Sequence, residues 1–163
     1  MKKYGLFFLT VLVIFIMDQL TKYFVVDSFS LHESIPVWEG FFHLTHVRNP
    51  GAAFGFLAGM DPNFRSVFFI AVNILAMVLI IFYLFKTEQR SFLLILGLSM
   101  IMAGALGNLT DRLRFGEVVD FLDFFLGSWH WPAFNVADAS ITTGAFLLVW
   151  KVWKMDKKDH LLP

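Results

Sequence analysis

The hydrophobic positions of this chain gather into long uncharged runs, and two of these runs are long enough to cross a membrane. Twenty residues without a charge extend from Ser66 to Phe85, and twenty more extend from Ser91 to Thr110. A helix needs roughly 20 mainly apolar residues to cross a hydrocarbon core about 30 Å thick. These two runs therefore predict two membrane-spanning helices, joined by a short charged segment.

Two further runs are shorter and have an acid at one end. Tyr4 to Met17 covers fourteen residues before Asp18, and Ala139 to Trp150 covers twelve residues after Asp138. Each forms a complete span only if the acid lies at or just inside one end of the helix. On this condition the chain contains four spans, which we predict at about 4–23, 66–85, 91–111 and 136–153.

The first run has an alternative interpretation, because Lys2 and Lys3 before an apolar stretch are also typical of a cleaved signal peptide. A signal peptide ends in a small-residue cleavage site, whereas "MDQLTKYF" follows here. We therefore interpret this run as a retained helix.

Composition supports the membrane assignment. Of the 163 residues, 58% are hydrophobic and only 16% are charged, which is too apolar for a soluble domain of this size. The length fits one domain, so we predict a single integral membrane domain over residues 1–163. The chain has no cysteine, which excludes disulfides and thiol chemistry. No basic stripe points to nucleic acid as a partner.

The charges are distributed unequally between the two ends of the predicted helices. With the N-terminus placed in the cytoplasm, the inner segments hold eight Lys and Arg residues, while the longer outer segments hold five. Ten of the thirteen acids fall on the outer side. Because cytoplasmic segments are enriched in Lys and Arg, both termini are expected to be cytoplasmic.

The first outer loop, about residues 24–63, is long enough to form structure of its own. Side chains between Phe42 and Val47 alternate as they do in a strand, and Trp38 and Phe41 suit the headgroup layer. We therefore expect an all-α membrane protein, a four-transmembrane-helix bundle, with a small extracytoplasmic β-like cap on the outer leaflet.

The third predicted span carries a face of small residues. Ser99, Ala103 and Gly107 recur every four positions, a spacing that lets two membrane helices approach closely. Asn108 lies inside the span on the adjacent face, and Asp111 lies at its end. The polar end of this helix is therefore continuous with its packing face, where a buried site would be held rigidly.

Two aspartates stand out among the outer polar residues. Asp120 lies in "EVVDF" among apolar neighbours, and Asp138 follows Asn135, a good N-cap for the last span. Capping alone would explain Asp138 but leaves Asp120 unexplained. Two carboxyl groups that share a site cannot both ionise easily, so one stays protonated while the other acts as a base on a water molecule. The pair therefore suggests an aspartic protease, with Asp120 expected to hold the shared proton.

Other polar residues near the outer ends have a simpler interpretation. Asp18 and Lys22 are spaced i, i+4 with the acid first, which is a favourable helical pair. Such a pair is typical of side chains that snorkel to the interface. Asp111 and Arg112 can likewise be interpreted as side chains that anchor the end of a helix at the interface.

Other chemistries find less support in the sequence. "LHESI" resembles the start of a zinc motif, but Pro36 occupies the place of the second histidine. The chain has neither a G-x-S-x-G elbow nor a phosphate-binding loop. We therefore expect no metal and no cofactor. A small proton-coupled transporter or a non-catalytic membrane scaffold stays open as the alternative, although the middle of the spans offers mainly Asn73 and Ser99 as polar groups.

Five short motifs follow one another through the predicted spans. They are "DQLTK" (18–22), "RNPGAAFG" (48–55), "GALGNLTDR" (104–112), "EVVDF" (117–121) and "FNVADASI" (134–141). Together they resemble bacterial lipoprotein signal peptidase, also called signal peptidase II. The resemblance implies an aspartic endopeptidase, without metal or cofactor, that cleaves prolipoproteins just before a cysteine carrying a diacylglyceryl group. It also implies a multi-pass protein of the bacterial cytoplasmic (inner) membrane, with its active site at the outer face and membrane lipid as a further partner.

The resemblance also implies roles for single residues. It places the catalytic pair at Asp120 and Asp138. We assign Asp18 and Lys22 to support of the fold rather than to the chemistry. The other matched positions are implied to bind the substrate or support the site, and these are Asn49, Gly51, Asn108, Asp111, Arg112 and Asn135.

Overall fold

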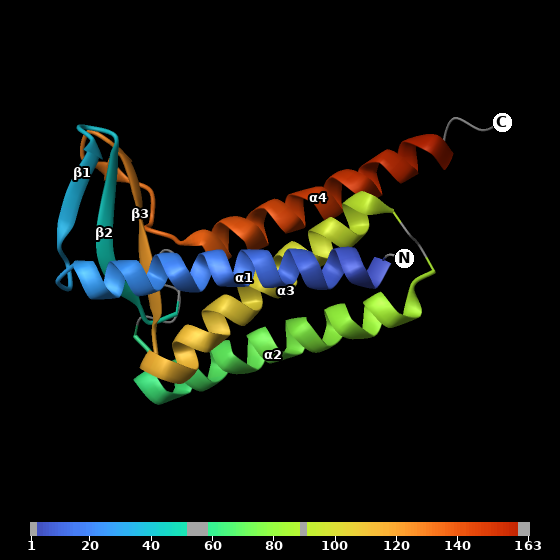
Figure 1. The fold of residues 1–163 in the computed structure, drawn as a ribbon, viewed down its shortest axis with the longest axis horizontal. Coiled ribbons are helices and arrows are strands. Elements are labelled where there is room, and N and C mark those ends of the chain that lie inside the picture. Colours follow the sequence, from blue (N-terminus) through green and yellow to red (C-terminus); the bar gives the residue numbers. More distant parts are fainter. Residues whose placement is uncertain (1–2, 52–58, 89–90, 160–163) are drawn as a thin grey trace.

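The structure, a computed structural model, describes residues 3–51, 59–88 and 91–159 of the chain. Four long helices form a bundle, and a small antiparallel sheet lies across one end of it (Figure 1). The helices are α1 (Lys3–Ser28), α2 (Pro62–Lys86), α3 (Phe92–Phe115) and α4 (Val136–Asp159). The strands are β1 (Ser34–Trp38), β2 (Phe42–Asn49), β3 (Val118–Leu126) and β4 (Trp129–His130).

Three of the helices that the structure describes, α1, α2 and α3, are long and apolar enough to cross a membrane. The remaining helix, α4, is 24 residues long. Its uncharged run ends at Trp150, and charged residues are frequent in the last turns that follow. The first three predicted spans therefore coincide with suitable helices, while the fourth span stays a prediction.

The helices extend past the predicted spans. α1 continues to Ser28, and α2 begins at Pro62 after the N-cap Asp61, whose carboxylate accepts hydrogen bonds from N–H groups of the first turn. Proline suits this position because its missing N–H has no partner there in any case. α3 ends at Gly116, which has a left-handed backbone (φ 76°) and donates to the carbonyl of Arg112. The segment between α1 and α2 therefore covers residues 29–61, which is shorter than the predicted range of 24–63.

α3 is the central helix of the bundle. It contacts α1, α2, α4 and β3, and 67% of its most apolar window is buried, against 11% for the windows of α1 and α2. The exposed surfaces of α1 and α2 consist largely of apolar side chains, as is typical of helices that face lipid.

Small residues on α3 let the main chain of α4 come into direct contact with this helix. Ser99, Ala103 and Gly107 are buried. A Cβ atom on Gly104 would overlap the carbonyl oxygen of Ala137 in the first turn of α4. The predicted small residues are therefore buried in the bundle, and Gly107 faces Asp18 of α1. The close contact with the N-terminus of α4 is made by Gly104, on the adjacent face of α3.

The sheet has the order β1-β2-β3-β4, with all neighbours antiparallel. The predicted strand in the first outer loop corresponds to β2. The sequence analysis missed β3 and β4, which come from the second outer loop, so the cap is built from both loops. In the register of β2 with β3, Asn49 lies opposite Val118 and Val47 lies opposite Asp120. This register brings the end of β2 next to the acid of β3.

Candidate active site

Asp120 is carried into the interior at the start of β3. The chain turns at Gly116 and enters the strand two residues later. The neighbours Val119 and Phe121 pack against Val25 near the C-terminal end of α1, and Asp120 itself is 1% exposed. The strand therefore buries a carboxyl group between two apolar neighbours in the chain, as the sequence predicts.

Asp138 lies in the first turn of α4. Its backbone N–H donates to Oδ1 of Asn135 at 2.9 Å, and its Oδ2 accepts from the backbone N–H of Asn135 at 3.2 Å. This reciprocal pair is a capping box, which confirms the predicted N-cap. It fixes the Asp138 carboxylate at a helix N-terminus, where the helix dipole stabilises a negative charge.

Asn135 connects the two aspartates. Its Nδ2 donates to Oδ1 of Asp120 at 2.7 Å and to the carbonyl of Val119 at 3.1 Å, while its other groups cap Asp138. Asn135 is completely buried. Two acids that are far apart in the chain therefore lie on two sides of one asparagine side chain.

Two more asparagines complete the contacts of the acids. Asn49 donates from Nδ2 to Oδ2 of Asp120 at 2.9 Å, and Asn108 donates from Nδ2 to Oδ1 of Asp138 at 2.8 Å. Together with Asn135, they supply an N–H group to each of the four carboxyl oxygens. Such donors stabilise negative charge on a carboxylate, which offsets part of the cost of burying the acids.

The surroundings of Asp120 favour its protonated form. Burial, and then the nearby charge of Asp138, raise the pKa of Asp120 to about 7, while the bonds from Asn49 and Asn135 and the charge of Lys22 act in the opposite direction. At neutral pH, a substantial fraction of Asp120 is therefore protonated. A protonated and an ionised carboxyl group side by side can act as acid and base on one water molecule.

A cleft of about 460 Å³ reaches Asp138, one member of this pair, and Asn49, which donates to the other. Asn49, Gly51, Arg112 and Asp138 are among its lining residues. The Arg112 guanidinium lies over the ring of Phe69, 5.2 Å from the centroid. Gly51 has a φ of 145°, and a Cβ atom there would overlap the same ring. The carboxyl group of Asp138 and the guanidinium of Arg112 therefore line the same cleft. The main chain at Gly51 lines it too, where the ring of Phe69 leaves no room for a side chain.

Part of the cleft comes from residues that the sequence analysis did not single out. They are Trp131, Pro132, Ala133, Phe134, Ala139, Thr142 and Thr143. The aromatic run "GSWHWPAFN" directly before the last helix was the available signal for the first four. Thr142 lies on α4 one turn beyond Asp138, on the same side of the helix, so helical spacing from the acid would have found it. Thr143 is one residue further and would not have been found in this way.

Behind the cleft lies a buried ion cluster. Lys22 pairs with Asp18 at 2.9 Å and with Asp111 at 3.0 Å, and all three side chains are almost completely buried. Asp18 also accepts from the backbone N–H of Ala137, and Asp111 accepts from that of Val119. The interpretation of Asp18 and Lys22 as snorkelling side chains is therefore wrong. The cluster ties α1 and α3 to the start of α4 and of β3.

Gln19 was also missed by the sequence analysis. Its Nε2 donates to Asp18 at 3.1 Å and to Asp111 at 3.2 Å. Its place inside "DQLTK", beside the acid, was the signal. Within the described ranges, no three His, Asp or Glu side chains are arranged to hold a metal ion.

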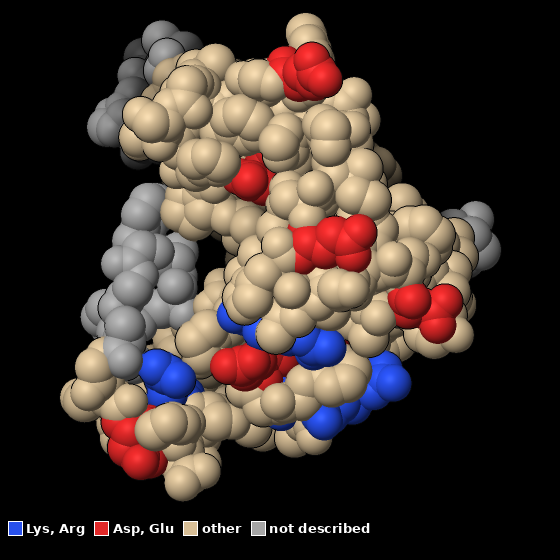
Figure 2. Space-filling model, turned by 90° about the vertical axis from the view of Figure 1, so that its left-hand side faces the viewer, with Lys and Arg blue, Asp and Glu red and all other residues tan. Residues whose placement is uncertain are grey.

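The sheet end of the molecule faces the viewer in Figure 2. Charged side chains of both signs lie close together there, within a surface that is otherwise largely uncharged (Figure 2). The opposite end of the bundle carries Lys3, whose Nζ donates to the carbonyl of Thr87 after α2.

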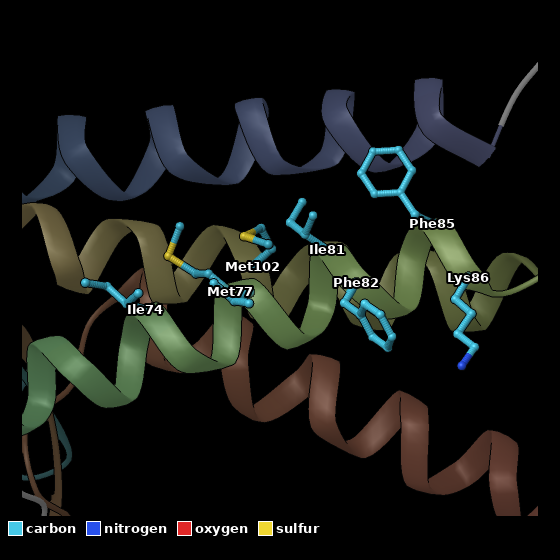
Figure 3. A pocket seen from close by; sticks show the side chains of 8 residues that line it. Ile74, Met77, Ile81, Phe82, Phe85, Lys86 and Met102 are labelled. Carbon is cyan, nitrogen blue, oxygen red and sulfur yellow. The ribbon is translucent and has the colours of Figure 1, made fainter.

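A larger cavity of about 830 Å³ lies on the side of the bundle (Figure 3), and neither Asp120 nor Asp138 lines it. One side of α2 and Met102 of α3 line it, and Lys86 stands at one end. The other lining side chains are Ile74, Met77, Val78, Ile81, Phe82 and Phe85. This surface offers no group for peptide chemistry, so the smaller polar cleft is the candidate active site.

Comparison with known proteins decides the family. A sequence profile of the signal peptidase (SPase) II family matches residues 10–154. The chain belongs to the signal peptidase II family. The lipoprotein signal peptidase of Syntrophus aciditrophicus is 50% identical over 155 residues, which cover 94% of this chain and 96% of the relative. That of Desulforapulum autotrophicum is 53% identical over 140 residues, which cover 86% of each chain.

Solved structures support the same fold. A bacterial membrane enzyme determined by the in meso method at 2.3 Å resolution matches with a TM-score of 0.86 and 32% identity, over 98% of this chain and 94% of that one. A second such enzyme, at 1.9 Å resolution, matches with a TM-score of 0.80 and 32% identity, over 91% and 92% of the two chains. The mostly helical membrane fold with a small antiparallel sheet is therefore shared with membrane enzymes.

Membership of the signal peptidase II family establishes the activity. The protein is a membrane aspartic peptidase that removes the signal peptide from lipoprotein precursors. The transporter or scaffold alternative is not favoured.

Proposed function

We propose that Asp120 and Asp138 are the catalytic pair of this peptidase, and that it cleaves immediately before a cysteine that carries a diacylglyceryl group. One observation carries the assignment of the pair. Asn135 bonds to both acids, and Asp120 has a pKa raised to about 7 beside Asp138. This is the condition under which two carboxyl groups divide the roles of acid and base.

The reaction follows from these two protonation states. The ionised Asp138 takes a proton from a water molecule as the water oxygen attacks the carbonyl carbon of the scissile bond. The carbonyl oxygen takes the proton of Asp120 as its double bond to carbon opens. The C–N bond then breaks, and the departing nitrogen takes the proton held by Asp138 while the new hydroxyl returns one to Asp120. The pair ends in its starting state, with one water consumed.

The remaining residues of the cleft are proposed to hold the substrate and stabilise charge. Asn49, Asn108 and Asn135 keep the carboxyl groups in place, and Arg112 stabilises the charge that develops on the carbonyl oxygen. Gly51 leaves room for the peptide main chain at the mouth of the cleft. Asp111, Asp18 and Lys22 support the site from behind.

The location is proposed from the distribution of charge and apolar surface. Four helices of one domain, residues 1–163, cross the bacterial inner membrane, with both termini in the cytoplasm and the sheet on the outer side. The diacylglyceryl chains of the substrate then stay in the outer leaflet while the scissile bond enters the cleft. The native chain has no cysteine, so single cysteines test this orientation cleanly. An impermeant thiol reagent on intact cells should label Glu39→Cys but not Lys154→Cys, and the reverse result would overturn the orientation.

The catalytic assignment is tested with purified protein and a synthetic precursor, with and without the diacylglyceryl group. Asp120→Asn and Asp138→Asn should each abolish cleavage while the protein stays folded. Asp123→Asn is the matched control, because Asp123 lies on the same strand but pairs with His130 at the hairpin. Turnover by either of the first two variants would reject the pair, and equal cleavage of both precursors would reject the lipid requirement.

A further inference from the structure

Lys22 uses all of its hydrogen-bonding capacity inside the protein. An ammonium group has three N–H donors, and three acceptors surround this one. Two are the carboxylates of Asp18 and Asp111, and the third is Oδ1 of Asn108 at 3.0 Å. Lys22 is 2% exposed, so water does not replace any of these partners.

The third contact determines which way the Asn108 amide points. Its oxygen faces the ammonium of Lys22, and its Nδ2 therefore faces Asp138, to which it donates at 2.8 Å. A rotated amide would place its N–H group against the donors of Lys22 and its oxygen against a carboxylate. Both contacts would be repulsive, so the cation fixes a single orientation.

We propose that Lys22 is a positioning residue for catalysis, which locks the Asn108 amide with its N–H group on Asp138. The inference rests on the proposed catalytic role of Asp138. Through this contact, a cation on α1 that does not touch the substrate aligns the base on α4. The role comes in addition to the structural role of the ion pairs.

The contacts separate the positioning role from the structural one. Asp18 and Asp111 each have further donors, from the main chain and from Gln19. The amide oxygen of Asn108, in contrast, has only one other described donor, Asn135 at 3.3 Å. Loss of the cation therefore leaves each carboxylate with main-chain and Gln19 donors, whereas the amide oxygen keeps only the longer bond from Asn135.

The test is a double-mutant cycle on kcat with lipidated precursor, using Lys22→Met, Asn108→Ala and the combination. Each single substitution should lower kcat about 100-fold, because misalignment of a reacting group costs a factor of this order. The combination should be no slower than Asn108→Ala alone, since the cation acts through the amide. Equal losses on Lys22→Met in both backgrounds would overturn the proposal.

The pH profile supplies an independent readout. The charged groups around the cluster are Asp18 and Lys22 of α1, Asp111 and Arg112 of α3, Asp120 of β3 and Asp138 of α4. The charge of Lys22 lowers the pKa of Asp120 directly. Lys22→Met should therefore move the alkaline limb of the profile upward with or without Asn108, whereas its effect on kcat at the optimum should vanish without Asn108.

A matched control separates stability from positioning. Asp18→Asn removes one ion pair but leaves Lys22 on Asn108, so it should lower the melting temperature while kcat falls less than about threefold. If Lys22→Met does not fold, the cycle is run with Asp18→Asn and Asp111→Asn added, which removes the two buried negative charges that Lys22 no longer neutralises. A loss of kcat for Asp18→Asn as large as that for Lys22→Met would contradict the positioning role. Failure of the catalytic pair would instead appear as turnover by Asp138→Asn.

Discussion

The Nδ2 atom of Asn135 lies 2.7 Å from Oδ1 of Asp120, and the same residue exchanges two hydrogen bonds with Asp138. One side chain therefore fixes the relative position of the two acids. The helix cap and the candidate active site are the same structure, so a change at Asn135 affects both.

Asn135→Ala should lower kcat about 100-fold, because a donor to the site and the alignment of the acids are lost together. The lost cap should cost about 1 kcal/mol of stability. Cleavage rate and thermal unfolding measured on the same preparation check both effects. A less stable variant with full kcat would show that Asn135 is only a cap.

Asn49→Ala should move the alkaline limb of the pH–rate profile to higher pH. The bond from Asn49 lowers the pKa of Asp120, so its removal raises this pKa further above the ordinary range. Activity that needs a protonated Asp120 then persists to higher pH. Thr45→Ala is the control on the same strand, because its hydroxyl bonds to Ser34 instead. An alkaline limb that stays at the same pH or moves to lower pH would contradict the role of Asp120 as the protonated partner.

Asp120→Asn should change the pH dependence of stability in a defined direction. The folded state holds a proton on Asp120 up to about pH 7, whereas the unfolded chain releases it near pH 4. The folded state thus binds more protons in this window, so native stability falls as pH rises from about 4 to about 7. The melting temperature of the variant, minus that of the native protein, should therefore increase between pH 4 and pH 8. A constant or decreasing difference would be inconsistent with the raised pKa.

Gly104→Ala should destabilise the protein by about 1–3 kcal/mol, because the new methyl group meets the main chain at Ala137 and the side chain of Ile141. Gly5→Ala is the matched control on α1, since no atom lies within 4 Å of the added group. It should be neutral or stabilising by up to about 1 kcal/mol. Denaturant or thermal unfolding in detergent compares the two, and equal effects would contradict the close contact of α3 with α4.

Asp111→Ala should cost about 3–5 kcal/mol, because it leaves Lys22 with one carboxylate fewer in a buried position and removes the acceptor of the Val119 N–H. Asp27→Ala, at an exposed position of α1, should change stability by no more than about 0.5 kcal/mol. Thermal unfolding of both variants checks the difference. A small effect at Asp111 would mean that the buried ion pairs add little to the fold.

The sequence was sufficient for the features that depend on local pattern. Runs of apolar residues located α1, α2 and α3, and the small-residue spacing identified side chains of α3 that are buried in the bundle. The cap at Asn135 followed from residue type alone. The five motifs then named the site residues, since chain spacing cannot show that Asp120 and Asp138 meet.

Features that depend on contacts between distant segments were not predictable in this way. The start of β3 is buried on both faces, so its apolar and acidic residues do not alternate clearly. The pattern of the sequence therefore did not predict a strand there. Asp18 and Lys22 have the spacing of an exposed pair, and only the approach of Asp111 from α3 makes their burial favourable. Phe69 of α2 likewise acquires its contact with the site from Arg112, on another helix.

The contact of Gly104 with Ala137 has a further consequence. The height of α4 relative to α3 depends on this close approach at Gly104, rather than on the apolar side chains at the surface of the bundle. Apolar side chains on the surface of the bundle can accordingly change to suit thinner or thicker bilayers, while the distances within the active site stay the same.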